Sequence, residues 1–296
     1  MDLIARLRTL IEERYVFADV AATVSHRLAA GRYPTDLAAF AEAVTADLQA
    51  DSRDKHLRVV HHDEPIPESA PGDDAEEYRA MRRWAARTGG GVAAVTRGPS
   101  NVGVLRLGPV LFPSVIAAEP VTAALTLVAD SDALVVDLRR CVGGEPSTVA
   151  FLISYLWDHE PAPLTGLRDR AGSTRQSWTL PYVPGRRFGK DRPVYVLTGG
   201  TTFSGGEQLA YDLQQLGRAT IVGEQTRGGA NARESFRLHP HLEATIPVVT
   251  AVHPTTRTSW EGVGVRPDVV STAAEAEAVA MRRASEASVA TRVAPR

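Results

Sequence analysis

The chain has 296 residues, of which 44% are hydrophobic, and its 33 basic and 35 acidic residues give a formal net charge of −2. A chain of this length can bury a large core, as one big domain or two modest ones. Because basic and acidic residues are interspersed, the charge pattern offers no footprint for nucleic acid or a membrane surface. No apolar stretch approaches the roughly 20 residues of a membrane-spanning helix.

The first thirty residues also disfavour a signal peptide. They carry Glu12, Glu13 and Asp19 where such a peptide needs an uninterrupted apolar region, so we expect a cytoplasmic protein. Cys141 is the only cysteine, which excludes an intramolecular disulfide and a zinc site built from cysteines. We expect it to be a small buried hydrophobe.

Hydrophobic periodicity predicts a helical region over residues 1–60, interrupted at Pro34. Apolar residues recur there at helical spacing: Leu3, Leu7, Leu10, Ile11, and later Leu37, Phe40, Val44 and Leu48. A Pro-, Asp- and Gly-rich loop follows over residues 62–74, and a short helix is expected over residues 76–87.

Beyond Gly89 the sequence alternates between β-type runs and helices, which is typical of an α/β core. We expect strands at 102–107, 133–138, 193–198, 219–223 and 243–249, and helices at 114–128, 146–157 and 204–216. Residues 161–190 are expected to form a long irregular segment. The chain after Thr272 is expected to form one helix that frays into a disordered end.

Ser204 lies in the segment 201–207, between an apolar run and a helix-like stretch. A serine at the start of a helix meets unpaired backbone N–H groups and the positive end of the helix dipole, a position that suits an acyl-transfer nucleophile. The alternative is an ordinary helix N-cap with Glu207 as the capping-box partner. Both interpretations stay open at this level.

Three further motifs follow expected strands, where open α/β sheets gather functional groups. The first, residues 137–144, ends in Gly143 and Gly144, and adjacent glycines let backbone N–H groups approach a ligand closely. A tight turn explains the same pair. The second and third motifs are residues 223–231 and 260–268. Neither the first motif nor residues 199–204 have the ending of a phosphate-binding loop or the spacing of a dinucleotide-binding loop.

Together, and in their order along the chain, the four segments resemble the tail-specific or C-terminal-processing serine peptidases. The similarity covers residues 54–270. The resemblance implies an α/β, crotonase-like (ClpP/crotonase) core with an N-terminal helical subdomain. The domains it implies are a helical subdomain (1–61), a linker and short helix (62–91), the peptidase core (92–275), and a C-terminal helix and tail (276–296).

The base of the reaction distinguishes two branches of that family. One branch uses a lysine in a G-x-x-T-x-G-K segment, but here Gly229 stands at the matching position and the only lysines are Lys55 and Lys190. The sequence is more similar to the tricorn-type peptidases and the bacterial relatives of interphotoreceptor retinoid-binding protein, which pair a histidine with a glutamate.

That resemblance implies His56, in a D-x-H segment, as the general base and Glu261, in a W-E-G-x-G-V-x-P-D segment, as the residue that orients it. From the residues alone, rivals remain. The other candidate histidines are His61, His62, His239 and His241, and Glu224 competes with Glu261.

The resemblance also implies an oxyanion hole formed by the N–H of Gly205 and one from the Gly143–Gly144 turn, with Gly144 favoured. Two departures stand out. Cys141 replaces a common asparagine, and glycines 205 and 206 replace small alanines, which adds backbone freedom that we expect to loosen the hole. The roughly thirty residues of 62–91 are too few for the PDZ module that many family members carry.

The expected function is therefore a serine endopeptidase that acts on unstructured peptides or polypeptide tails through an acyl-enzyme. No cofactor is implied, and metal catalysis is disfavoured because there is no H-E-x-x-H motif and His239-x-His241 lacks an evident third ligand. Two alternatives remain: a non-catalytic module that binds retinoids or fatty acids, and a hydrolase of small esters or amides. The sequence is compatible with a homo-oligomer.

Overall fold

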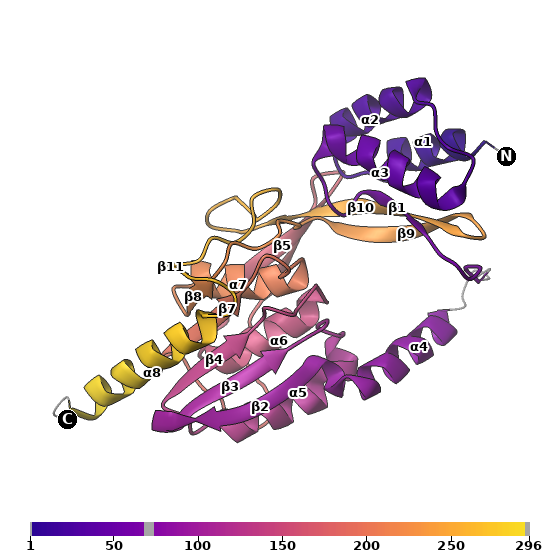
Figure 1. Ribbon diagram of the computed structural model, residues 1–296. Helices are drawn as coiled ribbons and strands as arrows, with labels where there is room; N and C mark the ends of the chain where they lie inside the picture. Colours follow the sequence, from indigo (N-terminus) through magenta and orange to yellow (C-terminus); the bar gives the residue numbers. More distant parts are fainter. Residues whose placement is uncertain (1, 68–73, 294–296) are drawn as a thin grey trace. The chain divides into compact units, whose positions relative to one another are not determined.

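The computed structural model describes residues 2–67 and 74–293 (Figure 1). The chain divides into two compact units, each assembled from separate stretches. Unit 1 comprises residues 1–74, 166–175 and 229–262, and unit 2 comprises residues 75–165, 176–228 and 263–296. The described architecture is mixed α/β, as expected.

Unit 2 is built on a six-stranded sheet in the order β11-β8-β7-β4-β3-β2. Its strands are β2 (Val92–Gly98), β3 (Val102–Leu107), β4 (Ala133–Asp137), β7 (Val194–Thr198), β8 (Thr220–Gly223) and β11 (Val269–Val270). Only β2 runs antiparallel to its neighbour. All five residues of β4 and of β7 are buried, which fits central strands covered on both faces.

Helices cover both faces of this sheet (Figure 1). Helix α8 (Ala276–Val293) packs alanines 276, 280 and 284 against alternate residues of β3, β4 and β7, including Val104, Val135 and Leu197. Helices α5 (Ser114–Val128), α6 (Pro146–Leu156) and α7 (Gly205–Gln215) pack with one another and on β2, β3 and β8. The remaining helical elements of unit 2 are α4 (Asp74–Arg87), η1 (Gly89–Gly91) and η2 (Pro99–Asn101).

Unit 1 packs three helices on an antiparallel sheet. The helices are α1 (Leu3–Arg14), α2 (Ala18–Ala30) and α3 (Leu37–Ser52). The strands β1 (Arg58–His61) and β9 (Ala232–His239) both pair with β10 (Leu242–Val252), which also pairs with β5 (Pro163–Asp169), and β6 (Thr174–Trp178) follows β5 in the sheet order. Leu7 and Ile11 of α1 are fully buried against Leu242 and Ile246.

The main expected helices and strands are confirmed, but the segment 161–190 is not irregular throughout. It contains β5 and β6, which the sequence analysis missed because arginine, threonine and aspartate interrupt their apolar pattern. Strands β1, β2, β9 and β11 were also missed. The expected disordered end falls partly outside the described residues. Among those described, no helix combines the length and apolar character needed to cross a membrane.

Candidate active site

Ser204 lies at a sharp turn between the central strand β7 and helix α7. Its backbone angles, φ 50° and ψ −119°, are unusual for a residue with a side chain. A turn of this kind between a strand and a helix presents a nucleophile at the carboxyl end of an α/β sheet, and backbone strain of this sort is concentrated at functional sites. The serine is therefore held in a conformation that an ordinary helix start does not need.

The buried carboxylate of Glu207 supports this turn. One oxygen accepts the N–H of Ser204 at 2.8 Å, and the other accepts the Thr226 hydroxyl at 2.5 Å and the N–H of Gly228 at 2.6 Å. The capping box considered for Ser204 and Glu207 is present. Ser204 and Glu207 thus form the expected helix cap. Glu207 also links the serine turn to the loop after β8.

The Gly143–Gly144 turn follows β4, the neighbour of β7 in the sheet, and lies beside Ser204. A Cβ built on Gly143 would be 3.5 Å from the Cβ of Ser204. A Cβ built on Gly205 would be 2.4 Å from the carbonyl oxygen of Gly144, so the two backbones are in close contact. The additional freedom expected at Gly205 is limited by this contact.

Hydrogen bonds fix the orientation of the glycine turn. Leu111 donates its N–H to the carbonyl of Gly143 at 2.9 Å and accepts the N–H of Glu145 at 2.8 Å. Among the described residues, the N–H groups of Gly144 and of Gly205 donate to no acceptor. Two backbone donors close to Ser204 are therefore available to a ligand.

In unit 1, three side chains converge. One oxygen of Asp54, one ring nitrogen of His56 and one oxygen of Glu261 all lie within 4.8 Å of one another. Asp54 and His56 are buried, with exposed fractions of 1% and 6%. The structure thus brings together the expected base and its expected orienting acid, with a second carboxylate that the sequence analysis did not assign.

A hydrogen-bond network holds this group. Asp54 accepts the N–H of His56 at 2.9 Å, the Asn231 amide at 2.8 Å and the Tyr15 hydroxyl at 3.2 Å. Burial raises the pKa of Asp54, and these three donors oppose that shift. Burial, followed by the negative charge of Asp54, raises the pKa of the Tyr15 hydroxyl. Tyr15 therefore stays protonated and donates.

Glu261 is held by the second motif. Its Oε2 accepts the backbone N–H groups of Ala230 at 2.5 Å and of Asn231 at 3.1 Å. The preceding residue, Trp260, is buried and donates its indole N–H to the carbonyl of Gly229 at 2.9 Å. The two glycine-containing motifs identified in the sequence thus meet around Glu261.

The expected triad is divided between the units: His56 and Glu261 belong to unit 1 and Ser204 to unit 2. Glu224, the rival acid, belongs to unit 2 and binds the N–H groups of Gly200 and Ala273, which lower its pKa. Among the rival histidines, His62 pairs with Glu243 at 2.9 Å and His241 contacts the carbonyl of His62.

Sequence reasoning missed the supporting roles of Tyr15, Asp54 and Asn231, whereas it named Glu207 as the capping-box partner of Ser204. Asp54 and Asn231 are 177 positions apart, so no local pattern links them. The sequence offered one signal: Asp54 lies in the D-x-H segment, and Asn231 lies in the motif 223–231. Cys141 is buried, and burial raises the pKa of its thiol to about 11, which agrees with an inert hydrophobe.

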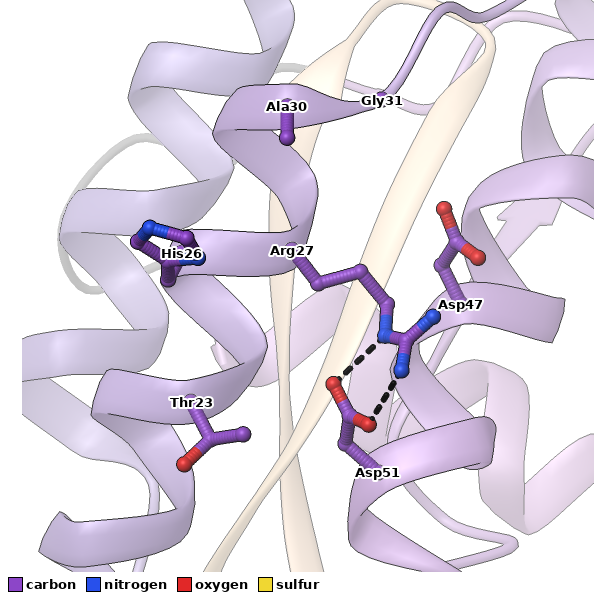
Figure 2. A pocket seen from close by; sticks show the side chains of 7 residues that line it. All are labelled: Thr23, His26, Arg27, Ala30, Gly31, Asp47 and Asp51. Atoms are coloured by element: carbon purple, nitrogen blue, oxygen red, sulfur yellow. Dashed lines mark hydrogen bonds and ion pairs between the residues drawn. The ribbon is translucent and has the colours of Figure 1, made fainter.

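A separate hollow of about 460 Å³ lies in unit 1, between α2 and α3 (Figure 2). Arg27 crosses it and binds both oxygens of Asp51 at 2.6 Å. None of its lining residues is an expected catalytic group: Thr23, His26, Arg27, Ala30, Gly31, Asp47 and Asp51. Since the arginine is already paired, this hollow does not compete with the Ser204 region as the reaction site.

Comparisons with known proteins are consistent with these motifs. Residues 102–271 match the model of peptidase family S41, and residues 1–84 match the N-terminal domain of that family's peptidases in eukaryotic IRBP. A putative peptidase from Parabacteroides merdae aligns with a TM-score of 0.63 and 18% identity, covering 99% of this chain and 96% of that one.

Two further structures have the same fold. The photosystem II D1 C-terminal processing protease aligns with a TM-score of 0.54 and 16% identity, over 92% of both chains. The tricorn protease aligns with a TM-score of 0.58 and 13% identity, over 97% of this chain and 36% of that much longer one.

Proposed function

Because the chain belongs to peptidase family S41 and is a serine peptidase, we propose that it cleaves unstructured peptides or polypeptide tails with a Ser204–His56–Glu261 triad. The observation that carries this proposal is the strained Ser204 turn beside two available backbone donors. The proximity of His56 and Glu261 in unit 1 supports their assignment as the base and its orienting acid. We propose in addition that the Ser204 hydroxyl lies within reach of the His56 imidazole when the enzyme acts.

In the proposed reaction, His56 removes the hydroxyl proton of Ser204 as the oxygen attacks the carbonyl carbon of the scissile bond. Glu261 accepts the second imidazole N–H and stabilises the imidazolium that forms. His56 then gives the proton to the leaving amine, and an acyl-enzyme remains on Ser204. A water molecule, deprotonated by His56, hydrolyses the ester and restores the serine.

The negative charge that develops on the carbonyl oxygen would be held by the N–H groups of Gly205 and Gly144. Such preorganised donors contribute about 3–4 kcal/mol each to transition-state stabilisation in known peptidases. Gly143 is the alternative source of the second donor. Everything the reaction needs comes from side chains and backbone.

The proposal extends to the architecture. We propose that residues 92–275 form a crotonase-like core, because the serine and the glycine turn follow the adjacent parallel strands β7 and β4. The boundaries 1–61, 62–91, 92–275 and 276–296 remain predictions, as do the cytoplasmic location and a homo-oligomer. Light scattering of the purified protein tests the oligomer.

The substrate class follows from the fold relatives only by analogy. One of them is a C-terminal processing protease, which favours polypeptide tails as substrates here. An unstructured chain can present its scissile bond in an extended conformation without first unfolding, so it is the substrate class that demands least of the enzyme. No nucleic acid or membrane component is part of the proposal.

Labelling with a fluorophosphonate, which reacts with activated serines, tests the proposal without a known substrate. The wild-type protein is expected to take up one label on Ser204, located by peptide mass spectrometry. Ser204→Ala should remove the label and His56→Ala should slow labelling strongly, while the exposed-site control Ser271→Ala should label normally. A folded wild-type protein that takes up no label would favour the ligand-binding alternative, and labelling with only ester turnover would favour a small-substrate hydrolase.

A further inference from the structure

The turn that connects α3 to β1 places the carboxylate of Asp54 beside the ring of His56. Arg53 ends α3 in the left-handed conformation, with φ 56°. Asp54 then accepts the N–H of His56, two residues later, at 2.9 Å, a local bond that aspartate forms readily in turns. Thr245 of β10 donates to the His56 carbonyl at 2.5 Å. The backbone of His56 is thus held on both sides, and one of its ring nitrogens lies within 4.8 Å of an Asp54 oxygen.

The hydrogen bonds of Asp54 favour its charged form. The residue is 1% exposed, and burial raises the pKa of its carboxyl. Four donors oppose that effect: the side chains of Asn231 and Tyr15 on Oδ2, and the backbone N–H groups of His56 and Leu57. A carboxylate that accepts several hydrogen bonds is favoured over the neutral acid. The network therefore supports a negative charge on Asp54 next to the imidazole.

Asn231 connects this carboxylate to that of Glu261. Its side chain donates to Oδ2 of Asp54 at 2.8 Å, and its backbone N–H donates to Oε2 of Glu261 at 3.1 Å. One oxygen of each acid and one His56 nitrogen lie within 4.8 Å of one another. Two carboxylates at such a distance repel each other, and a positive charge beside them is favoured. His56 supplies that charge when it takes up a proton.

We propose that Asp54 is a positioning residue that acts through His56: it holds the backbone of His56 and, with Glu261, stabilises the imidazolium formed when Ser204 loses its proton. The ring nitrogen near the two acids is the one that donates to Glu261, and the other nitrogen receives the serine proton. The two negative charges favour the imidazolium more than the neutral ring, so Asp54 lowers the barrier without strengthening substrate binding. This catalytic effect rests on the proposed function, whereas the effect of Asp54 on the protonation of His56 does not.

The protonation of His56 is measured by an NMR pH titration of the imidazole nitrogens in the full-length protein, with His56→Ala to identify the signal. The pKa of His56 should fall by about one pH unit or more in Asp54→Asn, because a nearby negative charge is lost. Asp54→Ser is a second neutral variant, whose hydroxyl can still accept the N–H of His56. Tyr15 and Glu261, the other titratable groups of unit 1 that face this pair, are left unchanged. Circular dichroism checks the fold of each variant.

Asp51→Asn is the matched control. Asp51 is another aspartate of unit 1, but it binds Arg27 at the surface, at 2.6 Å. Its loss should leave the titration of His56 unchanged. An unchanged pKa of His56 in a folded Asp54 variant would overturn the proposal. If neither variant folds, the wild-type titration decides: a pKa above the ordinary value of about 6.5 supports the proposal, and one at or below it overturns it.

Peptide cleavage measured in parallel separates this proposal from the proposed function. In Asp54→Asn, kcat should fall by about tenfold or more with KM little changed, and the acidic limb of the kcat/KM profile should move to lower pH together with the pKa of His56. A purely structural role would lower activity without moving that limb. A shifted His56 pKa in a protein whose cleavage does not depend on His56 would support the effect of Asp54 on His56 and contradict the proposed function. Cleavage that depends on His56, with a His56 pKa that is insensitive to Asp54, would overturn this inference alone.

Discussion

The backbone of Gly205 packs directly on that of Gly144, so that a Cβ on Gly205 would lie 2.4 Å from the Gly144 carbonyl oxygen. Gly144 in turn packs on Leu111, where a Cβ would lie 2.3 Å from the carbonyl oxygen, and its φ is +139°. Three backbone segments are thus in contact next to Ser204. A side chain at position 144 is incompatible with this arrangement.

Gly144→Ala is therefore expected to displace the turn. Turnover should fall by about 10²-fold, the usual effect of losing one oxyanion donor, and stability should fall by about 1–3 kcal/mol because of overpacking. Measurement of kcat, KM and urea unfolding checks both. Gly200→Ala is the control, because its Cβ would meet nothing closer than 3.6 Å and should change neither. Wild-type turnover in Gly144→Ala would remove this turn from the oxyanion hole.

Glu261 and Glu224 belong to different units and have different hydrogen-bond partners, so substituting each in turn tests which glutamate orients His56. Glu261→Gln keeps the size of the side chain but removes the charge beside His56, and turnover is expected to fall by about 10²- to 10⁴-fold without unfolding. Glu224→Gln should leave turnover nearly unchanged, because that carboxylate binds the N–H groups of Gly200 and Ala273. The reverse order of effects, measured as kcat/KM, would make Glu224 the acid.

The hydroxyl of Tyr15 is a buried donor to Asp54, and its removal should destabilise the protein. Tyr15→Phe removes one of the hydrogen bonds to this carboxylate, so the free energy of unfolding should fall by about 1.5–3 kcal/mol, the usual contribution of a hydrogen bond to a charged group. Tyr33→Phe is the matched control, since Tyr33 donates to Asp47 at a partly exposed site and should lose about 1 kcal/mol or less. Urea denaturation measures the free energy of unfolding of both variants. Equal losses would contradict a special role for Tyr15.

Asp212 gives the protein a pH-dependent stability. Burial raises its pKa to about 6 from 3.8, against hydrogen bonds from Thr165 and Gln208. Between these values the folded protein holds a proton that the unfolded chain releases, so the contribution of Asp212 to the free energy of unfolding falls as the pH rises from about 4 to about 6, by about 3 kcal/mol at most.

In Asp212→Asn this component is absent, and the Oδ1 contacts with Thr165 can persist. The stability of the variant relative to wild type should therefore increase with pH across that window, measured by urea unfolding at several pH values. Parallel curves for the two proteins would show that Asp212 does not titrate there.

The sequence predicted the core strands and helices well, because β3, β4 and β7 are short, mainly apolar runs and the apolar residues of α3 recur at helical spacing. It missed β5 and β6, whose polar residues obscure the alternation. The motifs located Ser204, His56 and Glu261, but the positive φ of Ser204 has no signature in a serine. The bonds from Tyr15 and Asn231 to Asp54 join residues 39 and 177 positions apart, which only the folded chain brings together.

The central claim is that Ser204 is the nucleophile of a peptidase for unstructured chains. Its most direct test is incubation of wild-type and Ser204→Ala protein with an unfolded protein and a peptide library, with products identified by mass spectrometry. The account predicts cleavage by the wild-type protein and by Ser271→Ala, and none by a correctly folded Ser204→Ala. Equal cleavage by wild type and Ser204→Ala, or none by the wild-type protein, would contradict it.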